Sequence, residues 1–400
     1  MEQAAVWGIP KGRPAFRVSL MRLLPALLAS AALPLAALVL SACGAPESSP
    51  SAPAPAPSAQ QQAAQTPTTP GLARADIEGA VPTVATASET TSLAAGTTPN
   101  PTPGSVTPAS GTPPAGTPAA MKPDAGMIRL QILLDRSAFS PGQIDGLHGE
   151  NTRQAIAAYR EAKNLGSGDV ADAALLQSLT SADAGPVTQD YVLTTADVSG
   201  PFSPPPSEDL KAQAAAGTNY STALERIAER FHVSESLLQT LNPGVDFRTA
   251  GARIMVPVLN MTPLGAVARI EVDKREKAVR AYDASDTLIA FYPATIGSGD
   301  NPSPSGEVKV NGVARAPDYT YDPSKLSYGP GGDKVIVPAG PNNPVGAVWI
   351  DLDRPSYGIH GTPNPTKIGK SASHGCVRLT NWDAQQLAAA VKPGVMVRFL

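Results

Sequence analysis

The spacing of apolar residues changes along the chain and divides it into helical and strand-like parts. Over residues 127–182, apolar side chains recur every three or four positions, which predicts three short helices. The clearest of these places four apolar residues on one face, namely Ala155, Ile156, Tyr159 and Ala162. The turn-forming pairs Pro141-Gly142 and Asp145-Gly146 separate this helix from the one before it. We expect a small helical domain over residues 125–182.

A second unit is expected over residues 190–258. One helical face carries four apolar residues, namely Leu224, Ile227, Ala228 and Phe231. The next helix opens with the capping residue Ser234 and closes at a proline, and the strand-like run 253–257 follows it. A first strand is expected at residues 191–194. The predicted order is therefore strand, two helices and strand, with the proline-bearing stretch 201–206 inserted after the first strand.

Residues 264–400 have a period of two or continuous apolar runs, which predicts short strands. The five runs are Val267–Val272, Ala278–Tyr282, Thr287–Tyr292, Val345–Ile350 and Val395–Leu400. One helix interrupts them, beginning at Thr380 and completed by Val391. The stretch 311–344 is rich in glycine, proline and tyrosine, and we expect a loop or flap over a site there. The fold class predicted for this part is an antiparallel, β-sandwich-like or barrel-like domain.

The first 43 residues have the features of an export signal. Four basic residues come first, namely Lys11, Arg13, Arg17 and Arg22, and the apolar run 23–40 follows. This run ends in Leu40-Ser41-Ala42-Cys43, which resembles the lipobox of bacterial lipoproteins. That resemblance implies cleavage before Cys43 and lipidation of its thiol. A permanent transmembrane helix is an alternative that the prolines of this run disfavour, and Met21 is an alternative start.

Residues 44–124 have the composition of a linker. They contain 16 prolines and no aromatic residue, and alanine, threonine, serine, glycine and glutamine make up most of the rest. Such a segment cannot bury enough apolar surface to offset the entropy lost when it becomes ordered. We therefore expect a disordered tether between the N-terminal anchor and the folded domains.

Charge and cysteine content narrow the functions that the chain can have. It has 31 basic and 34 acidic residues among 400, a net charge of −3, and no basic stripe, which disfavours a nucleic-acid partner. The length favours two or three domains. Only two cysteines are present, and if Cys43 carries lipid, Cys376 has no partner for a disulfide. An unpaired cysteine in an exported protein is either an intermolecular bridge or a reactive thiol.

Cys376 stands close in sequence to two of the four histidines, His360 and His374. A cysteine attacks as its thiolate, and an imidazole within hydrogen-bond reach takes the proton and stabilises the resulting ion pair. Gly375 leaves room for an acyl group, and its backbone N–H and that of Cys376 are candidates for an oxyanion hole. The alternatives are a buried, inert cysteine and a structural zinc site that adds Asp383, but no Cys-x-x-Cys pair supports zinc. We expect neither a metal nor a cofactor.

The segments Ile359–Thr362 and Ser373–Leu379 resemble the catalytic signature of the YkuD-type L,D-transpeptidases. Upstream, Pro302–Gly306 is similar to that family's Pro-Thr-Pro-x-Gly segment, with serine in place of threonine. The resemblance extends over residues 266–400 and implies a β-sandwich domain with a catalytic cysteine.

The same resemblance implies a role for each residue of the motif. Cys376 corresponds to the nucleophile and His360 to the general base, with its ring oriented by the carbonyl of Gly361. His374 supports the loop that carries the nucleophile. Four residues fall on the substrate or oxyanion side of the site, namely Gly361, Ser373, Gly375 and Arg378, the last as a candidate for binding a substrate carboxylate.

Resemblance to this family implies a transferase that acts on peptidoglycan. Such an enzyme cleaves the bond between the diamino acid and D-alanine in a tetrapeptide stem and passes the acyl group from its cysteine to an amine. The acceptor stays open: another stem peptide, a lipoprotein lysine, a free D-amino acid or, in an L,D-carboxypeptidase, water. A catalytically inactive lipoprotein that tethers the wall is the alternative from another class. A papain-like endopeptidase is disfavoured because its cysteine precedes its histidine in sequence.

The two smaller units also resemble wall-binding modules. Residues 145–152 contain the Asp-Gly-x-x-Gly-x-x-Thr core of the peptidoglycan-binding domain that is common in wall hydrolases. The 190–258 unit resembles the LysM module, which binds glycans that contain N-acetylglucosamine, although the insertion departs from that pattern. The partners implied are peptidoglycan and, through Cys43, a membrane. The implied location is the periplasm or cell envelope of a bacterium.

Overall fold

The computed structural model describes residues 71–82, 122–259, 263–299, 301–325, 332–373 and 375–400. All of them belong to the same compact unit. The expected export signal with Cys43, and the expected loop-supporting residue His374, lie outside the described residues. None of the helices within the described ranges is long and apolar enough to span a bilayer.

The expected disorder of residues 44–124 is contradicted at residues 71–82. This segment contains helix α1 (Arg74–Glu78), which packs against α2 and β1 of the following modules. Ile77 is fully buried, and the carboxylate of Glu78 accepts a hydrogen bond from the Thr188 backbone N–H at 2.9 Å. The composition of this segment wrongly predicts disorder, because Ile77 and Glu78 are held by contacts to residues of the modules that follow.

Three helices form the helical module (residues 122–182) at the places where the apolar period predicted them. They are α2 (Ala125–Arg136), α3 (Glu150–Ala162) and α4 (Ala173–Ala182). The Asp124 side chain caps α2 by accepting from the Met127 N–H at 2.7 Å. Buried Gln131 accepts from the N–H groups of Asp145 and Gly146, so the turn before α3 is fixed from inside the module.

Residues 188–258 form what we call the two-stranded module. Its elements are β1 (Thr188–Val192), α5 (Thr195–Val198), α6 (Leu210–Ala216), α7 (Ala223–Arg230), α8 (Glu235–Leu241) and β2 (Arg253–Pro257). Strands β1 and β2 pair in antiparallel register from Thr188 opposite Pro257 to Val192 opposite Arg253. The strand expected near residue 191 is therefore present and pairs with the strand after the helices. Residues 199–222, which carry α6, form the insert between α5 and α7.

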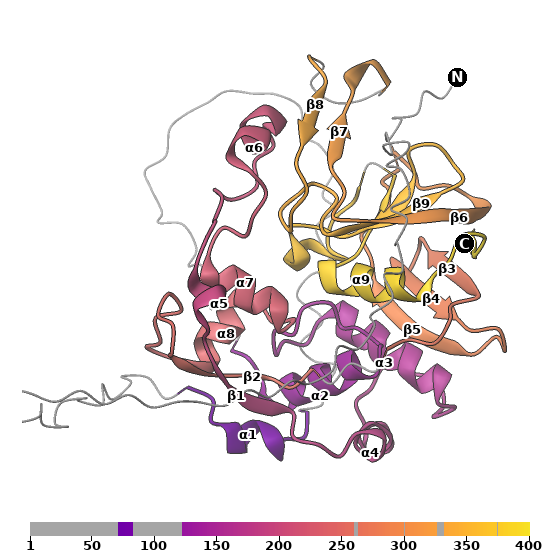
Figure 1. Ribbon diagram of the computed structural model, residues 1–400. Coiled ribbons are helices and arrows are strands. Elements are labelled where there is room, and N and C mark those ends of the chain that lie inside the picture. The colour runs from indigo at the N-terminus through magenta and orange to yellow at the C-terminus, as the bar shows by residue number, and fades with distance from the viewer. Residues whose placement is uncertain (1–70, 83–121, 260–262, 300, 326–331, 374) are drawn as a thin grey trace, which may run out of the picture. The chain divides into compact units, whose positions relative to one another are not determined.

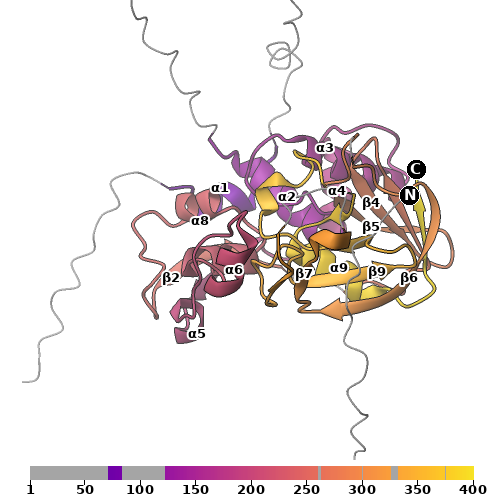
Figure 2. The ribbon, with the colours of Figure 1, turned by 90° about the horizontal axis from the view of Figure 1, so that it is seen from above.

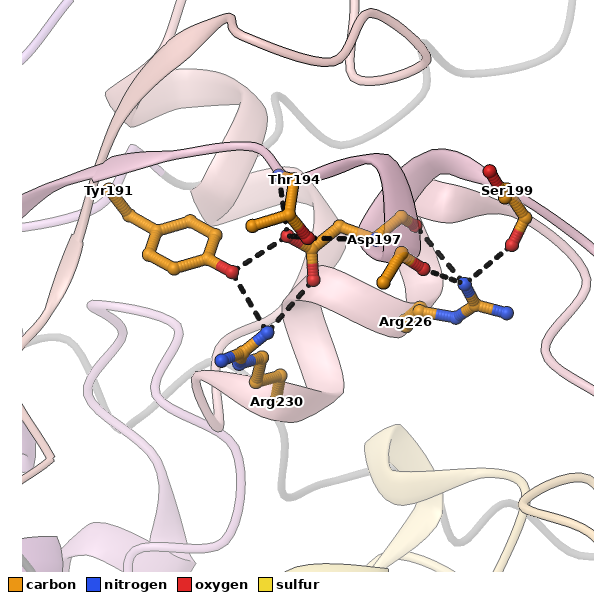
Figure 3. Close-up of polar contacts among 7 residues, drawn as sticks. Tyr191, Thr194, Asp197, Ser199, Arg226 and Arg230 are labelled. Carbon is orange, nitrogen blue, oxygen red and sulfur yellow. Dashed lines mark hydrogen bonds and ion pairs between the residues drawn. The ribbon is translucent and has the colours of Figure 1, made fainter. Parts of the chain in front are cut away.

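A polar network holds β1 and α5 against α7 across this insert (Figure 3). The Tyr191 hydroxyl donates to the Asp197 carboxylate at 2.7 Å, and the same carboxylate pairs with Arg230 of α7 at 2.8 Å. Arg226, one turn earlier in α7, donates to the backbone carbonyls of Asp197 and Ser199. These contacts join β1 and α5 to α7 directly, so the module does not depend on α6 of the insert to hold these elements together.

The domain of residues 264–400, which the sequence predicts to be catalytic and which we call the catalytic domain, is built on an eight-stranded sheet. Its strands are β3 (Arg269–Asp273), β4 (Ala278–Tyr282), β5 (Leu288–Pro293), β6 (Gly306–Arg315), β9 (Val348–Leu352), β10 (Gly358–His360), β11 (Val377–Arg378) and β12 (Met396–Phe399). They are hydrogen-bonded in the order β11-β10-β9-β6-β12-β3-β4-β5. Helix α9 (Asn381–Ala390), capped by Thr380, lies between β11 and β12 along the chain.

The sheet differs from the purely antiparallel sandwich that the sequence predicted. The pairs β12–β3 and β10–β11 are parallel. The long strand β6 pairs with β12 through its first half and with β9 through its second half, with a register shift between Val310 and Gly312. A bulge of this kind bends a strand, and it curls the two halves of the sheet around one core. Parallel neighbours were hidden because apolar alternation does not reveal which strands pair.

Two apolar cores hold the chain together, and one of them is shared. One lies between the sheet of the catalytic domain and α9 and takes in only Ala138 from the helical module. The other joins the helical module, the two-stranded module and the β4–β5 side of the catalytic sheet. There the Phe291 N–H donates to the Ala138 carbonyl, and the Ser140 N–H donates to the Phe291 carbonyl, both at 2.9 Å. Figures 1 and 2 show α3 beside β5.

A buried polar junction joins the same three parts of the protein. His232, after α7, bonds through Nδ1 to the Asp135 carboxylate at 3.0 Å and stacks on Trp382 with ring centroids 4.9 Å apart. Asp383 accepts from the Ser140 hydroxyl at 3.0 Å, and burial raises its pKa to about 7. The side chain of His232 therefore links the helical module and the catalytic domain.

The expected flap over residues 311–344 is partly regular structure. Strand β6 continues to Arg315, and β7 (Tyr319–Tyr321) pairs with β8 (Val335–Val337) in a separate hairpin. Helix α6 of the insert lies beside this hairpin (Figures 1 and 2). Gln213 in α6 donates to the Asn342 carbonyl at 2.6 Å, and Thr218 donates to the Pro338 carbonyl at 3.0 Å. The insert thus holds the segment that follows the hairpin.

Candidate active site

Strands β10 and β11 bring the cysteine and the first histidine together. They are parallel, with Ile359 opposite Val377 and His360 opposite Arg378. Extending this register by one residue sets Cys376 opposite the residue two positions before His360. Side chains two residues apart on a strand lie on the same face of the sheet. The side chains of Cys376 and His360 therefore share one face, although 15 residues separate them in the chain.

His360 is held in one tautomer inside the domain. It is 3% exposed, stacks on Trp349 with centroids 5.4 Å apart, and bonds through Nδ1 to the Gly361 carbonyl at 2.7 Å. Because a carbonyl only accepts, Nδ1 carries the proton and Nε2 is the free base. Burial, reinforced by the positive charge of Arg378, lowers the pKa of His360 to about 3, against backbone hydrogen bonds to Gly361 and Val345. The expected orientation by Gly361 is the arrangement found.

Cys376 rests as a neutral thiol. Its side chain is partly exposed, and Sγ donates to the Ser356 carbonyl at 3.4 Å. Burial raises the thiol pKa to about 11, although the Gly358 backbone and the charge of Arg378 lower it. In the described part of the chain, no hydrogen bond joins Cys376 to His360. Both pKa shifts favour the neutral forms of Cys376 and His360, in contrast to the ion pair that the sequence suggested.

The loop before Cys376 is held by two serine hydroxyls. Ser373 donates to the Cys376 carbonyl at 2.5 Å and accepts from the Gly375 N–H at 3.1 Å. Ser303, from the Pro302–Gly306 segment, donates to the Gly375 carbonyl at 2.6 Å. The expectation that the Gly375 N–H is a free oxyanion donor is therefore wrong in this arrangement, since Ser373 already occupies it. The N–H of Cys376 remains a candidate.

Both the backbone conformation and the space around residue 375 require a glycine there. Its φ is +117°, which side chains rarely adopt, and an added Cβ would lie 2.9 Å from the Tyr357 ring. Arg378, three residues later, is the cation of the site and lowers the pKa of both His360 and Cys376. Within the described residues its buried Nε has no hydrogen-bond partner, so one N–H of the guanidinium is unpaired.

Similarity to known proteins agrees with this geometry. The model of the YkuD family, an L,D-transpeptidase catalytic domain, matches residues 267–398. The YkuD protein of Bacillus licheniformis, which is named as an L,D-transpeptidase, is 34% identical over 176 residues. The match covers 44% of this chain and 91% of that protein. The chain belongs to the YkuD family of L,D-transpeptidases.

Other proteins named as L,D-transpeptidases are also similar to this chain. The ErfK/SrfK protein of Escherichia coli (strain K12), also named as an L,D-transpeptidase, is 30% identical over 183 residues, which cover 44% of this chain and 59% of that protein. Among solved structures, an L,D-transpeptidase from Xylanimonas cellulosilytica is 15% identical with a TM-score of 0.32. That match covers 72% of this chain and all of that structure.

Several residues of this YkuD-type site were not assigned a role from sequence. Ser303 lies in a segment that the sequence singled out, but its bond to Gly375 only becomes visible in three dimensions. Trp349 and Ser356 come from β9 and from the turn before β10, and no local motif marks them. No group of three or more potential metal ligands occurs among the described residues.

We expect the thiol of Cys376 to ionise above the value of about 8.5 that is usual for cysteine, because burial raises its pKa. Alkylation by iodoacetamide, followed on the Cys376 peptide by mass spectrometry, should still accelerate above about pH 9. Arg378→Gln should move the titration to still higher pH, since it removes a charge that favours the thiolate. A midpoint at or below about 8.5 in the native protein would contradict the neutral resting pair.

Proposed function

We propose that this chain is an enzyme that cleaves the diamino acid–D-alanine bond of peptidoglycan tetrapeptide stems through a thioester on Cys376. The acyl group then passes to an amine, so that wall strands are cross-linked or remodelled. The observation that carries the proposal is the β10–β11 register, which sets the only thiol of residues 44–400 on the same face as a histidine whose Nε2 is unprotonated. Membership of the YkuD family supports the same reaction class.

The acylation step begins from the neutral pair. The thiol proton of Cys376 passes to Nε2 of His360 while the sulfur attacks the carbonyl carbon of the diamino acid. The tetrahedral intermediate collapses, the amide C–N bond breaks, and the imidazolium returns the proton to the departing amine of D-alanine. One amide bond is lost and one thioester is formed.

The second half of the reaction restores the enzyme. An acceptor amine attacks the thioester carbon and gives a proton to Nε2 of His360, and the Cys376 sulfur leaves and takes that proton back. Arg378 lowers the pKa of both groups, and within the described residues its buried Nε has no hydrogen-bond partner. We assign it to an anionic part of the substrate or to the developing oxyanion, where a charge-assisted hydrogen bond is strong.

The rest of the chain fits delivery of this domain to the wall. We propose that the first 43 residues direct export, that Cys43 is lipidated, and that the helical and two-stranded modules bind peptidoglycan. The last point rests on their resemblance to a peptidoglycan-binding domain and to LysM. The protein would then act in the bacterial periplasm or cell envelope while anchored to a membrane.

Incubation of the purified protein with a disaccharide tetrapeptide, followed by liquid chromatography and mass spectrometry, tests the function. We expect release of free D-alanine together with a cross-linked dimer joined through two diamino acids. Release of D-alanine with only the tripeptide product would identify water as the acceptor. Absence of any D-alanine release would support the inactive tether and contradict the proposal.

A further inference from the structure

Asn381, the first residue of α9, bonds to separate parts of the molecule. Its Oδ1 accepts from the Ala347 N–H at 2.9 Å, and its Nδ2 donates to the Pro341 carbonyl at 3.1 Å. The same Nδ2 donates to Oε1 of Glu229, in α7 of the two-stranded module, at 2.8 Å. Asn381 is 1% exposed, so a bond lost here leaves a polar atom unpaired away from water. The carboxamide thus ties the loop 341–347 to α7.

The carboxamide also packs against the residues that hold the catalytic imidazole. A Cβ added to Gly361 would lie 2.1 Å from Oδ1 of Asn381, and one added to Gly346 would lie 2.2 Å from it. The carbonyl of Gly361 accepts from Nδ1 of His360, and the backbone of Val345, beside Gly346, also hydrogen-bonds to the imidazole. Any shift of Asn381 would therefore displace the groups that set the tautomer of His360.

Glu229 supports this carboxamide from another module. Besides the bond from Asn381, it accepts one from the Tyr220 hydroxyl at 3.4 Å. Glu229 is half-buried, and desolvation raises its pKa to about 7 against the effect of both hydrogen bonds. A carboxyl group in such a place costs stability, and costly polar groups are retained where they serve a purpose.

The insert holds the same loop at its other end. The N–H of Asn342 donates to the Thr218 carbonyl at 2.9 Å, and its side chain donates to the Asn219 carbonyl at 3.0 Å. A Cβ added to Gly340 would lie 2.3 Å from the Thr218 hydroxyl, which shows how closely the two segments pack. The two-stranded module therefore contacts the loop where it begins and, through Asn381, where it reaches His360.

We propose that Glu229 is a positioning residue for His360 and acts through Asn381. The proposal rests on the proposed function, in which His360 is the general base. By accepting from Nδ2, Glu229 selects the amide orientation that turns Oδ1 toward Ala347 and Gly361. That orientation keeps the Gly361 carbonyl against Nδ1, so that Nε2 stays free to take the thiol proton. The two-stranded module thus completes the catalytic site, in addition to any binding to the wall.

Four variants of the full-length chain test this inference. Glu229→Ala removes the acceptor, whereas Glu229→Gln keeps a side-chain oxygen at the same distance from Asn381 and removes only the charge. Glu225→Gln is the matched control, because it removes a carboxylate one turn earlier on the same helix without touching Asn381. Tyr220→Phe removes the other hydrogen bond to Glu229. Thermal unfolding of each variant checks that the fold is kept.

Two measurements separate positioning from a merely structural role. The first is kcat and KM for D-alanine release from a soluble tetrapeptide, and the second is the imidazole ¹H–¹⁵N spectrum of His360, which reports the tautomer. We expect Glu229→Ala to lower kcat by about 10-fold or more with little change in KM, and to mix the tautomers of His360. Glu229→Gln, Glu225→Gln and Tyr220→Phe should all stay within about 2-fold of the unmodified enzyme.

The inference is overturned if folded Glu229→Ala keeps its kcat and its His360 spectrum. It is also overturned if Glu229→Gln loses as much activity as Glu229→Ala, because the charge and not the acceptor would then matter. The spectrum does not depend on turnover. If the unmodified chain releases no D-alanine but Glu229→Ala still mixes the tautomers, the proposed function fails while the positioning role stands.

Discussion

Cys376→Ser should abolish D-alanine release while leaving the fold unchanged. A hydroxyl is far less acidic than a thiol, so His360 cannot activate it to a comparable degree. We expect turnover to fall by at least about 1,000-fold, to the level of a blank. Liquid chromatography of the muropeptide mixture measures the loss, and thermal unfolding checks the fold.

A second readout places the chemistry on the sulfur itself. By resemblance to its family, the unmodified chain should form a covalent adduct with a carbapenem, visible by intact-mass spectrometry, and the serine variant should not. Cys43→Ala is the matched control, because it removes the other thiol far from the site in sequence. Near-normal turnover by Cys376→Ser would show that the nucleophile lies elsewhere.

His360→Ala should lower turnover by at least about 100-fold, the smaller end of what a general base contributes. Because the pKa of His360 lies at about 3 instead of 6.5, the ring stays unprotonated as the pH falls through 6.5. The kcat/KM of the unmodified enzyme should therefore show no acid limb near neutrality. A limb centred near 6.5 would show that the imidazole titrates normally in the free enzyme.

The variant His360→Gln distinguishes the loss of a base from a loss of structure. His360 packs on Trp349 and is buried, so alanine leaves a cavity beside the ring. His360→Gln fills more of that space but provides no basic nitrogen, and it should be as inactive as His360→Ala while unfolding at a higher temperature. Recovery of activity in the glutamine variant would mean that packing, and not proton transfer, is the contribution of His360.

Local sequence patterns were sufficient to predict those features that depend on a single helix or strand. The helices of residues 125–182, the strand near residue 191 and helix α9 follow from apolar period and capping residues. The sequence also pointed to Cys376 and His360 together, through a rare thiol and a family motif, and the β10–β11 register sets their side chains on one face. The orientation of His360 by the Gly361 carbonyl, expected from that resemblance, is the arrangement found.

What sequence could not supply depends on contacts between distant segments. The Gly375 N–H looked free because nothing local shows that Ser373 folds back to accept from it. The neutral state of Cys376 and His360 follows from burial, which is a property of the assembled domain. Glu229 and Asn381 stand 152 residues apart, and neither lies in a motif that points to the other.

The pairing of residues 138–140 with β5 also bears on solubility. Strand β5 is the outermost strand of the eight-stranded order, and such edges are templates for association with other chains. In the intact protein, the N–H and carbonyl of Phe291 are occupied by Ala138 and Ser140. A fragment cut at residue 264 would expose these groups beside an apolar face that normally enters the shared core. The helical module therefore covers this edge strand. We expect a catalytic fragment to stay soluble only if it includes the helical module, and so begins before residue 125.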